Sequence, residues 1–491
     1  MKIWQEKYFP VFLILLNILL IFCIFDPRLF LGGDNVTFII LARSLLDGQG
    51  YRDLSQAEAP VFIGSPPGYP VFLMLLMLIF GDLAGVILFK LASVVLSSIT
   101  LYSFYRLLRL SFDNKIFIIM TSLFVVVNFN ILYPNQLELS DVLFNTFLFA
   151  SLYFFMSKGK YGESAGIFLA VLATYTRYAG IVLVFALLAY LLVKKKLKKF
   201  WQYGLLSFAL ILPWAIYVFA HGFTLTDILT GAPYVAERKL ITLAELLQRW
   251  VYNFKFYFFG LFPQDLLGWL SPPVWIGIMA TIVIIIGFYL KIRAKFTALE
   301  SYSIFYFMLI ISWPQVWSAE RYILPIIYFM GLYFAYALFK ILKPRIFALA
   351  LSLLILYNAS VIFRRIPLTY QRVQAQLEGK ISRYYPSDWL AFFLCCNWIN
   401  RNLPDQAIIV SRKPNMVYFQ TGNQGFVYPF STDKEYVLEQ IRKADYILID
   451  NFEWTNATQV FLYPAMLKHP EYFEDAYVHP TEKVYVVKVK K

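Results

Sequence analysis

Charged residues are scarce in this sequence of 491 residues: Asp, Glu, Lys and Arg make up 15% of it, while 60% is apolar. Soluble domains contain about 25% charged and about 45–50% apolar residues. The sequence therefore lacks the polar surface that a water-soluble globule needs, and its composition predicts an integral membrane protein.

Cysteine and histidine are also scarce, with three residues of each. Cys23 lies inside an apolar run, while Cys395 and Cys396 are adjacent. This spacing fits neither a disulfide framework nor a zinc cluster, so we interpret all three as packing residues. The sequence also has no G-x-G-x-x-G motif and no P-loop, and it predicts no nucleotide-binding site.

Negative charge is in the minority: 30 Asp and Glu oppose 44 Lys and Arg, which gives a net charge of +14. In a soluble chain this balance would suggest nucleic acid. Here the basic residues cluster in short loops between apolar runs, as cytoplasmic loops of membrane proteins do. We therefore predict no nucleic-acid partner and a cytoplasmic N-terminus. The basic loops lie near 106–115, 158–160, 194–199, 291–295 and 340–345.

Eleven apolar runs alternate with these loops and predict membrane-spanning helices, since a span is built from about 20 mostly apolar residues. A further run, 69–80, would break the alternation, so we predict that it forms a helix at the outer interface. The segment TYTRYAG at 174–180 predicts an outward-facing break that carries Arg177. The predicted spans lie near 8–25, 85–105, 116–133, 142–157, 164–176, 179–193, 200–220, 274–290, 299–313, 321–341 and 345–363.

Hydropathy drops after Phe363, and strand-like apolar runs then alternate with helical stretches. This pattern predicts a small α/β domain over 364–491, which an odd number of spans places outside the cytoplasm. The predicted fold class is thus a polytopic α-helical membrane protein with about eleven transmembrane helices over 1–363 and a C-terminal extracytoplasmic α/β domain. The strand-like runs lie at 407–411, 446–450 and 484–489.

Ionisable residues outside the basic loops gather near the predicted outer ends of the helices, where charge is costly and indicates function. One interpretation is a structural network of ion pairs that holds helix ends together. The other is a site in which a carboxylate takes a proton while cations hold an anionic leaving group, such as a phosphate. The acidic members are Asp34, Glu138 and Asp141, and the basic members are Lys90, Arg177 and Arg321.

Several short motifs surround these residues in a fixed order. The sequence contains Asp34, ARSLL at 42–46 and GQGY at 48–51, PPGYP at 66–70, a run ending in Phe80-Gly81, Lys90, ELSD at 138–141, TRYAG at 176–180 and RYILP at 321–325. This order and its sidedness resemble the GT-C glycosyltransferases that use polyprenyl-phosphate sugars, in particular the protein O-mannosyltransferases and the lipid A aminoarabinose transferase. Ser65 stands where the protein O-mannosyltransferases have a histidine before the Pro-Pro pair.

The resemblance implies catalytic roles for the three acids. Asp34 would be the general base, although an Asp before a helical run is also a favoured N-cap. Glu138 and Asp141 are three residues apart and could share one helical face. From that face they would orient the acceptor or a metal ion, while the alternative for Asp141 is a helix cap.

The resemblance also implies binding roles for basic and aromatic residues. Lys90, Arg177 and Arg321 would hold the donor phosphate, although Arg321 could instead extend from a helix end towards water. For substrate binding the assigned residues are Arg43, Tyr178 and Tyr322, although Arg43 could simply pair with Asp47. We interpret Trp313, Trp317 and Tyr322 as interfacial belt residues in preference to a sugar platform.

The activity implied is an inverting hexosyl or pentosyl transfer from a polyprenyl-phosphate sugar to a lipid, glycan or protein acceptor. It would take place among membrane lipids at the outer, periplasmic face of the plasma (inner) membrane. No cofactor is required, because the carrier supplies the activated bond; the first loop has no D-x-D motif, so no metal is assigned, although a divalent cation could take part. The alternatives are a lipid or polysaccharide transporter or flippase, and a scaffold that has lost its chemistry.

Overall fold

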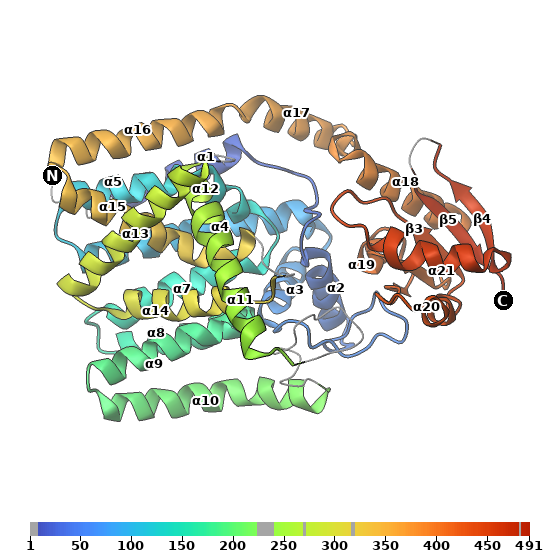
Figure 1. The fold of residues 1–491 in the computed structure, drawn as a ribbon, viewed down its shortest axis with the longest axis horizontal. Coiled ribbons are helices and arrows are strands. Elements are labelled where there is room, and N and C mark those ends of the chain that lie inside the picture. Colours follow the sequence, from blue (N-terminus) through green and yellow to red (C-terminus); the bar gives the residue numbers. More distant parts are fainter. Residues whose placement is uncertain (1–7, 223–239, 269–271, 316–319, 481–482) are drawn as a thin grey trace.

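Two parts of different architecture are adjacent in Figure 1: a bundle of helices and, at the C-terminal end, a five-stranded sheet with helices around it. The bundle is built from residues before 364, and all of the strands follow residue 408. This computed structural model describes residues 8–222, 240–268, 272–315, 320–480 and 483–491.

Apolar runs form the bundle helices, and a helix occurs in each of the eleven ranges predicted to span the membrane. Within the described residues, five helices are long and apolar enough to cross a membrane, or six if the bent pair α5 and α6 forms one span. The chain is thus a multi-pass membrane protein, and the count of eleven spans stays a prediction. The helices in the predicted spans are α1 (Phe9–Cys23), α4 (Val86–Ser111), α5 (Lys115–Val126) with α6 (Phe129–Leu132), α7 (Ser140–Met156), α8 (Gly162–Thr176), α9 (Ile181–Val193), α10 (Leu197–Ala220), α13 (Val274–Ala294), α14 (Ala298–Ser312), α15 (Leu324–Ile341) and α16 (Pro344–Phe363).

The predicted break around Arg177 is present. Helix α8 ends at Thr176, Arg177 is extended (φ −148°, ψ 140°), and a short 3-10 turn, Tyr178–Gly180, leads into α9. A Cβ atom on Gly180 would lie 2.3 Å from the backbone nitrogen of Thr174. Only glycine allows the chain to return this closely on itself, so the break is tight and its position is fixed.

Two helices outside the predicted spans, α2 (Asn35–Leu46) and α3 (Gly68–Phe80), pack against each other beside the break. A Cβ on Gly68 would lie 2.6 Å from the backbone oxygen of Tyr175, so the start of α3 touches the end of α8. Helix α3 coincides with the run 69–80, and its place at the outer interface stays a prediction. Because of this contact, the Pro-Pro segment lies next to Arg177.

The segment between α10 and α13 also contains helices, which the sequence analysis left unassigned. Helix α11 (Leu243–Phe254) begins with a capping box, in which Thr242 and Glu245 satisfy each other's backbone nitrogens. A π-helical turn over Lys255–Leu261 and helix α12 (Phe262–Leu267) follow it. Charged residues on one face of α11 lower its average hydropathy, and a search for continuous apolar runs therefore misses it.

The C-terminal sheet has the strand order β2-β1-β3-β5-β4. Strands β1, β2 and β3 are parallel, whereas β5 runs antiparallel to both β3 and β4. Three of the strands were predicted; β2 has only two residues and β4 carries charged ones, so neither forms a recognisable apolar run. The strands are β1 (Ile409–Ser411), β2 (Gly425–Phe426), β3 (Tyr446–Ile449), β4 (Phe473–Val478) and β5 (Tyr485–Val489).

Side-chain alternation along these strands gives the sheet two apolar faces. Val410, Ile447 and Val487 pack against α20 (Lys434–Ile441) and α21 (Tyr463–Lys468). Ile409, Leu448 and Val486 belong to a second core, which includes α18 (Ser387–Asn402) and α19 (Pro414–Thr421). Cys395 and Cys396 of α18 are buried in this second core, so both act as packing residues.

The second core extends into the N-terminal part of the chain. Leu29, Val36, Ile40 and Leu54 of the first loop and α2 belong to the same cluster of buried residues as Trp389 of α18. The backbone nitrogen of Gly425 also donates to the backbone oxygen of Ser55. The C-terminal sheet and the first loop are therefore packed as one hydrophobic unit, and the predicted division of the chain at 363/364 stays a prediction.

An ion-pair cluster fixes the connection between the bundle and the C-terminal domain. Helix α17 (Ile366–Leu377) follows α16, and its Arg372 contacts the carboxylate of Asp26 at 2.9 Å. Asp26 also contacts Arg28 at 2.7 Å, and it is almost fully buried. The carboxylate thus ties α17 to the chain just after α1.

Candidate active site

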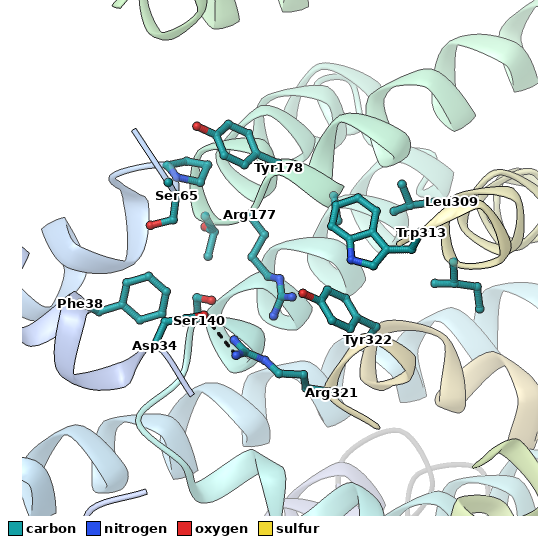
Figure 2. A pocket seen from close by; sticks show the side chains of 15 residues that line it. Asp34, Phe38, Ser65, Ser140, Arg177, Tyr178, Leu309, Trp313, Arg321 and Tyr322 are labelled. Carbon is teal, nitrogen blue, oxygen red and sulfur yellow. Dashed lines mark hydrogen bonds and ion pairs between the residues drawn. The ribbon is translucent and has the colours of Figure 1, made fainter. Parts of the chain in front are cut away.

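A pocket of about 150 Å³ lies where the first loop, the Pro-Pro segment, the helix break and the turn before α15 converge (Figure 2). Three of the six predicted catalytic and phosphate-binding residues, Asp34, Arg177 and Arg321, line it, and a fourth, Asp141, contacts both arginines. Its lining residues are Asp34, Phe38, Gly64, Ser65, Pro66, Ser140, Thr176, Arg177, Tyr178, Ala179, Leu309, Ile310, Trp313, Arg321 and Tyr322.

Asp34 occupies the N-cap position of α2, but its side chain makes no capping hydrogen bond. The carboxylate instead contacts Arg321 at 3.2 Å, and 66% of the Asp34 side chain is exposed. An Asp at an N-cap normally accepts from the first turn of its helix. Because that bond is absent, the Asp34 carboxylate is available to a ligand in the pocket.

Arg321 connects two of the predicted acids. Its Nη1 contacts Asp34, and its Nη2 contacts Asp141 at 3.1 Å. Asp141 is 2% exposed and lies in the first turn of α7. Arg321 comes from a short 3-10 helix, Glu320–Ile323, that leads into α15. Asp141 therefore anchors a guanidinium group that reaches the exposed carboxylate.

Arg177 contacts the other oxygen of Asp141. Its guanidinium carbon lies 5.5 Å from the ring centre of Tyr322, whose ring in turn lies 5.7 Å from that of Trp313. In Figure 2, Asp34 and Phe38 stand on one side of the pocket, with Tyr322 and Trp313 on the other. Arg177 and Arg321 thus converge on one buried carboxylate, between an acidic side and an aromatic side of the pocket.

Lys90 and Glu138 do not line this pocket. They form an ion pair of 2.8 Å in which both side chains are 0% exposed. The other oxygen of Glu138 accepts from the backbone nitrogen of Phe30, at 2.7 Å, and from Asn35, at 2.8 Å. Glu138 therefore holds the first loop next to α2, and its charge is neutralised by Lys90.

The expectation that Glu138 and Asp141 share one helical face is wrong. Helix α7 begins at Ser140, and the preceding Leu137 and Leu139 are extended (ψ 152° and 149°). Glu138 thus lies outside the helix, and its partners differ from those of Asp141. A second cavity, of about 170 Å³, is lined by Lys90, Arg28 and Tyr385 and lies on this separate side of the first loop.

The fold also places the three predicted substrate-binding residues in different locations. Tyr178 and Tyr322 line the pocket, and the Tyr178 hydroxyl donates to the backbone oxygen of Ile63 at 2.7 Å. Arg43 does not line it; its guanidinium carbon lies 5.7 Å from the ring centre of Phe419 on α19. Trp317, predicted as a belt residue, lies outside the described residues.

Sequence reasoning missed several polar groups of the pocket. Ser65 lines it with a buried hydroxyl oxygen that has no hydrogen-bond partner among the described residues. Ser140 and Thr176 also line it, and both adjoin motifs that the sequence analysis had selected. Their closeness to Asp141 and Arg177 in the sequence was the available signal, but hydroxyl residues are too common for it to be distinctive.

A divalent cation would have to compete with Arg321 in this arrangement. Asp34 lines the pocket and Asp141 lies behind it, and both contact that arginine. Within the described residues there is no group of three His, Cys, Asp or Glu side chains placed to hold a metal ion. The polar groups of the pocket are better suited to anionic and hydroxyl groups, which accept from guanidinium and donate to carboxylate.

The sequence and the fold are similar to those of known proteins. The family described as dolichyl-phosphate-mannose-protein mannosyltransferase matches residues 64–217, which include the Pro-Pro segment, Asp141 and Arg177. A search of curated proteins with the sequence finds no match.

Among solved structures, ArnT from Cupriavidus metallidurans is similar in its apo state, with a TM-score of 0.60, 12% identity and coverage of 97% of both chains. Its complex with undecaprenyl phosphate has a TM-score of 0.58, 13% identity and the same coverage. The Archaeoglobus fulgidus oligosaccharyltransferase tethered to an acceptor peptide has a TM-score of 0.61 and 11% identity, over 99% of this chain and 75% of that one. The chain thus shares its fold with these solved structures over nearly its whole length, and part of its helical bundle is similar to the mannosyltransferase family.

Proposed function

We propose that this protein is a glycosyltransferase that moves a sugar from a polyprenyl-phosphate carrier to an acceptor hydroxyl at the outer face of the plasma membrane, with inversion at the anomeric carbon. The observation that carries the proposal is the uncapped carboxylate of Asp34, exposed at a pocket that two arginines enter. The complex of ArnT with undecaprenyl phosphate supports a carrier of this class.

Asp34 is the general base in this proposal. The acceptor oxygen attacks the anomeric carbon while its proton passes to the Asp34 carboxylate, and the bond from that carbon to the phosphate oxygen breaks. The electron pair of this bond leaves with the polyprenyl phosphate. Because attack comes from the face opposite the phosphate, a single displacement inverts the configuration.

Arg177 and Arg321 stabilise the leaving phosphate. The phosphodiester of the donor carries one negative charge, and the phosphate gains a second as the bond breaks. At the same time Asp34 takes up a proton and loses its negative charge, which weakens its hold on Arg321. The guanidinium of Arg321, still anchored by Asp141 at 3.1 Å, is then free to donate to the phosphate.

The proposal also assigns the side of the membrane on which the pocket lies and the presence of an acceptor site. We place the pocket at the outer face, with the N-terminus cytoplasmic and the C-terminal domain periplasmic, because the basic loops lie at the other ends of the helices. The tethered acceptor peptide of the archaeal oligosaccharyltransferase supports an acceptor site on this fold. A transporter is not favoured, because the matched family and the similar structures are transferases.

Transfer and its stereochemistry test this function together. Purified protein is incubated with a panel of polyprenyl-phosphate sugars, labelled in the sugar, and with extracted membrane acceptors. We expect label to reach an acceptor with at least one donor, and NMR to show the anomeric configuration inverted relative to that donor. Retention would contradict a single displacement, while lipid movement in vesicles without transfer would favour the transporter.

Arg177→Ala is expected to weaken carrier binding. A hydrogen bond to a charged group contributes about 1.5–3 kcal/mol, so the Kd for polyprenyl phosphate should rise roughly 10- to 100-fold. Titration of the detergent-solubilised protein with polyprenyl phosphate measures this change. Arg177→Lys keeps the charge without the planar fork and should show a smaller loss. An unchanged Kd in Arg177→Ala would remove this residue from the donor site.

A further inference from the structure

A pair of cations on the C-terminal domain, Arg412 and Lys413, comes just before helix α19, which packs against α2; neither residue lines the pocket itself. Asn415, two residues after Lys413, donates to the hydroxyl of Thr37 at 3.0 Å. Thr37 is in the first turn of α2, which Asp34 begins. This bond brings the starts of α19 and α2 together, and Figure 1 shows the two helices next to each other.

The electrostatics of Lys413 agree with this placement. Burial of the ammonium group and the neighbouring Arg412 lower the pKa of Lys413, whereas Asp34 acts on it in the opposite direction. An interaction of this kind requires that the carboxylate lies near the ammonium group. This influence agrees with the contact between α19 and α2 that the Asn415–Thr37 bond makes.

Aromatic rings hold the two cations in place. The guanidinium carbon of Arg412 lies 4.9 Å from the ring centre of Phe430 and 5.0 Å from that of Trp454. The ammonium nitrogen of Lys413 lies 5.2 Å from the same Trp454 ring, and 49% of Trp454 is exposed. Cation–π contacts of this kind orient a cation without neutralising its charge.

Neither cation has a carboxylate partner within 4.0 Å among the described residues. The Nε of Arg412 is buried and has no hydrogen-bond partner there. Buried Asp450 acts on Arg412 electrostatically, but its carboxylate accepts from the Thr458 hydroxyl at 2.8 Å. Arg177 and Arg321, by contrast, are paired with Asp141, so among these four cations the two without a carboxylate partner in the described part of the chain belong to the C-terminal domain.

The position of Arg412 and Lys413 relative to Asp34 indicates whether they would bind the donor or the acceptor. In an inverting transfer the acceptor stands on the side of the base, and the donor phosphate stands on the opposite side. The bond between Asn415 and Thr37 joins the segment of Arg412 and Lys413 to the helix that Asp34 begins, while Arg177 contacts the aromatic side. A guanidinium and an ammonium group together suit a phosphate or a carboxylate.

We propose that Arg412 and Lys413 form an acceptor subsite that binds the anionic group of an acidic sugar, a phosphorylated sugar or a uronate. The proposal rests on the proposed function, since it assigns the acceptor side of the same pocket. Trp454 orients both cations, and the acceptor hydroxyl then reaches Asp34. The subsite selects acceptors by charge and takes no part in bond cleavage.

Binding of small sugars tests the subsite without requiring transfer. Calorimetric titration of the full-length protein uses glucose 1-phosphate, glucuronate and neutral glucose as probes. We expect at least one acidic sugar to bind more tightly than glucose, and the two acidic probes separate phosphate from carboxylate. The double variant Arg412→Gln/Lys413→Gln should weaken that binding at least tenfold. Because this readout is independent of catalysis, absence of transfer would contradict the proposed function and leave the subsite standing.

A matched control uses exposed cations of the same domain. Arg401→Gln/Lys434→Gln removes the same charge away from α2 and should bind all three probes like the unmodified protein. If the double variant at 412 and 413 unfolds, Lys413→Gln alone keeps the Arg412 packing and should still weaken binding severalfold. Equal binding of acidic and neutral sugars would overturn the proposal. The proposal would also be overturned if the double variant at 412 and 413 lost binding of polyprenyl phosphate but bound acidic sugars as before.

Discussion

Asp34→Asn is expected to lower kcat for sugar transfer by about 100- to 10,000-fold, the usual contribution of a general base. Asparagine has nearly the same shape and keeps an oxygen that can accept from Arg321, but it cannot take the acceptor proton. Binding of the polyprenyl phosphate should change little, because the arginines remain. Initial transfer rates, measured beside carrier titrations, separate these two effects.

Stability provides the control for this prediction. If Asp34 served only as a helix cap, Asn would cap equally well and activity would persist. The side chain makes no capping bond, so the melting temperature of Asp34→Asn should stay close to that of the unmodified protein. Asp47→Asn, at the other end of α2, is the matched exposed acid and should leave the rate unchanged. Transfer at nearly the unmodified rate in Asp34→Asn would exclude it as the base.

Lys90→Met is expected to have the largest effect on stability. It would leave the fully buried Glu138 carboxylate without its ion-pair partner, and removal of one partner from a buried pair costs about 3–5 kcal/mol. Glu138 also fixes the backbone of Phe30 in the first loop, so that loop should loosen first. Thermal unfolding in detergent measures the loss.

A second substitution distinguishes the structural role of Lys90 from a role in donor binding. In Lys90→Met/Glu138→Gln the buried charge is gone, and the glutamine oxygen still accepts from Phe30 and Asn35. We expect this double variant to regain most of the stability and to bind polyprenyl phosphate normally. Lys115→Met is the exposed control. Weakened carrier binding in the double variant, with stability recovered, would instead support the predicted contact between Lys90 and the donor.

Much of the helical framework follows from the sequence because long apolar runs dominate it. The break at Arg177 was predictable for the same reason: two short apolar runs on either side of a charged turn allow few other arrangements. The run 69–80 was recognised as helical from its composition alone. By contrast, α11 carries charged residues on one face only, and its helical signal lies in its period, which a count of apolar residues does not detect.

The sequence predicted which residues belong to the candidate site better than it predicted how they are arranged. The sequence analysis placed six ionisable residues at one level, but it could not divide them between two locations. That division depends on where α7 begins: with Ser140 as its first residue, Glu138 turns towards Lys90 and Asp141 towards Arg321. A shift of helix start by a few residues lies below what sequence patterns determine.

The contribution of Arg412 and Lys413 could not be predicted for a different reason. They lie in a segment without a motif, and their closeness to Asp34 arises from packing between parts of the chain that are far apart in sequence. The same holds for Ser65, whose hydroxyl enters the pocket through the contact of Gly68 with the break. Long-range packing of this kind leaves no local pattern.

The core shared by the first loop and the C-terminal sheet has a consequence for the order of events during biosynthesis. Trp389 leaves the ribosome about 355 residues after Asp34, a delay of roughly 20–70 s at about 5–20 residues per second. Until then Val36 and Ile40 lack their apolar cover. The nascent chain thus completes the helices of the bundle first, while the loop that carries Asp34 waits for a core that is synthesised hundreds of residues later. We therefore expect a product truncated before Trp389 to be integrated in the membrane but unable to transfer sugar.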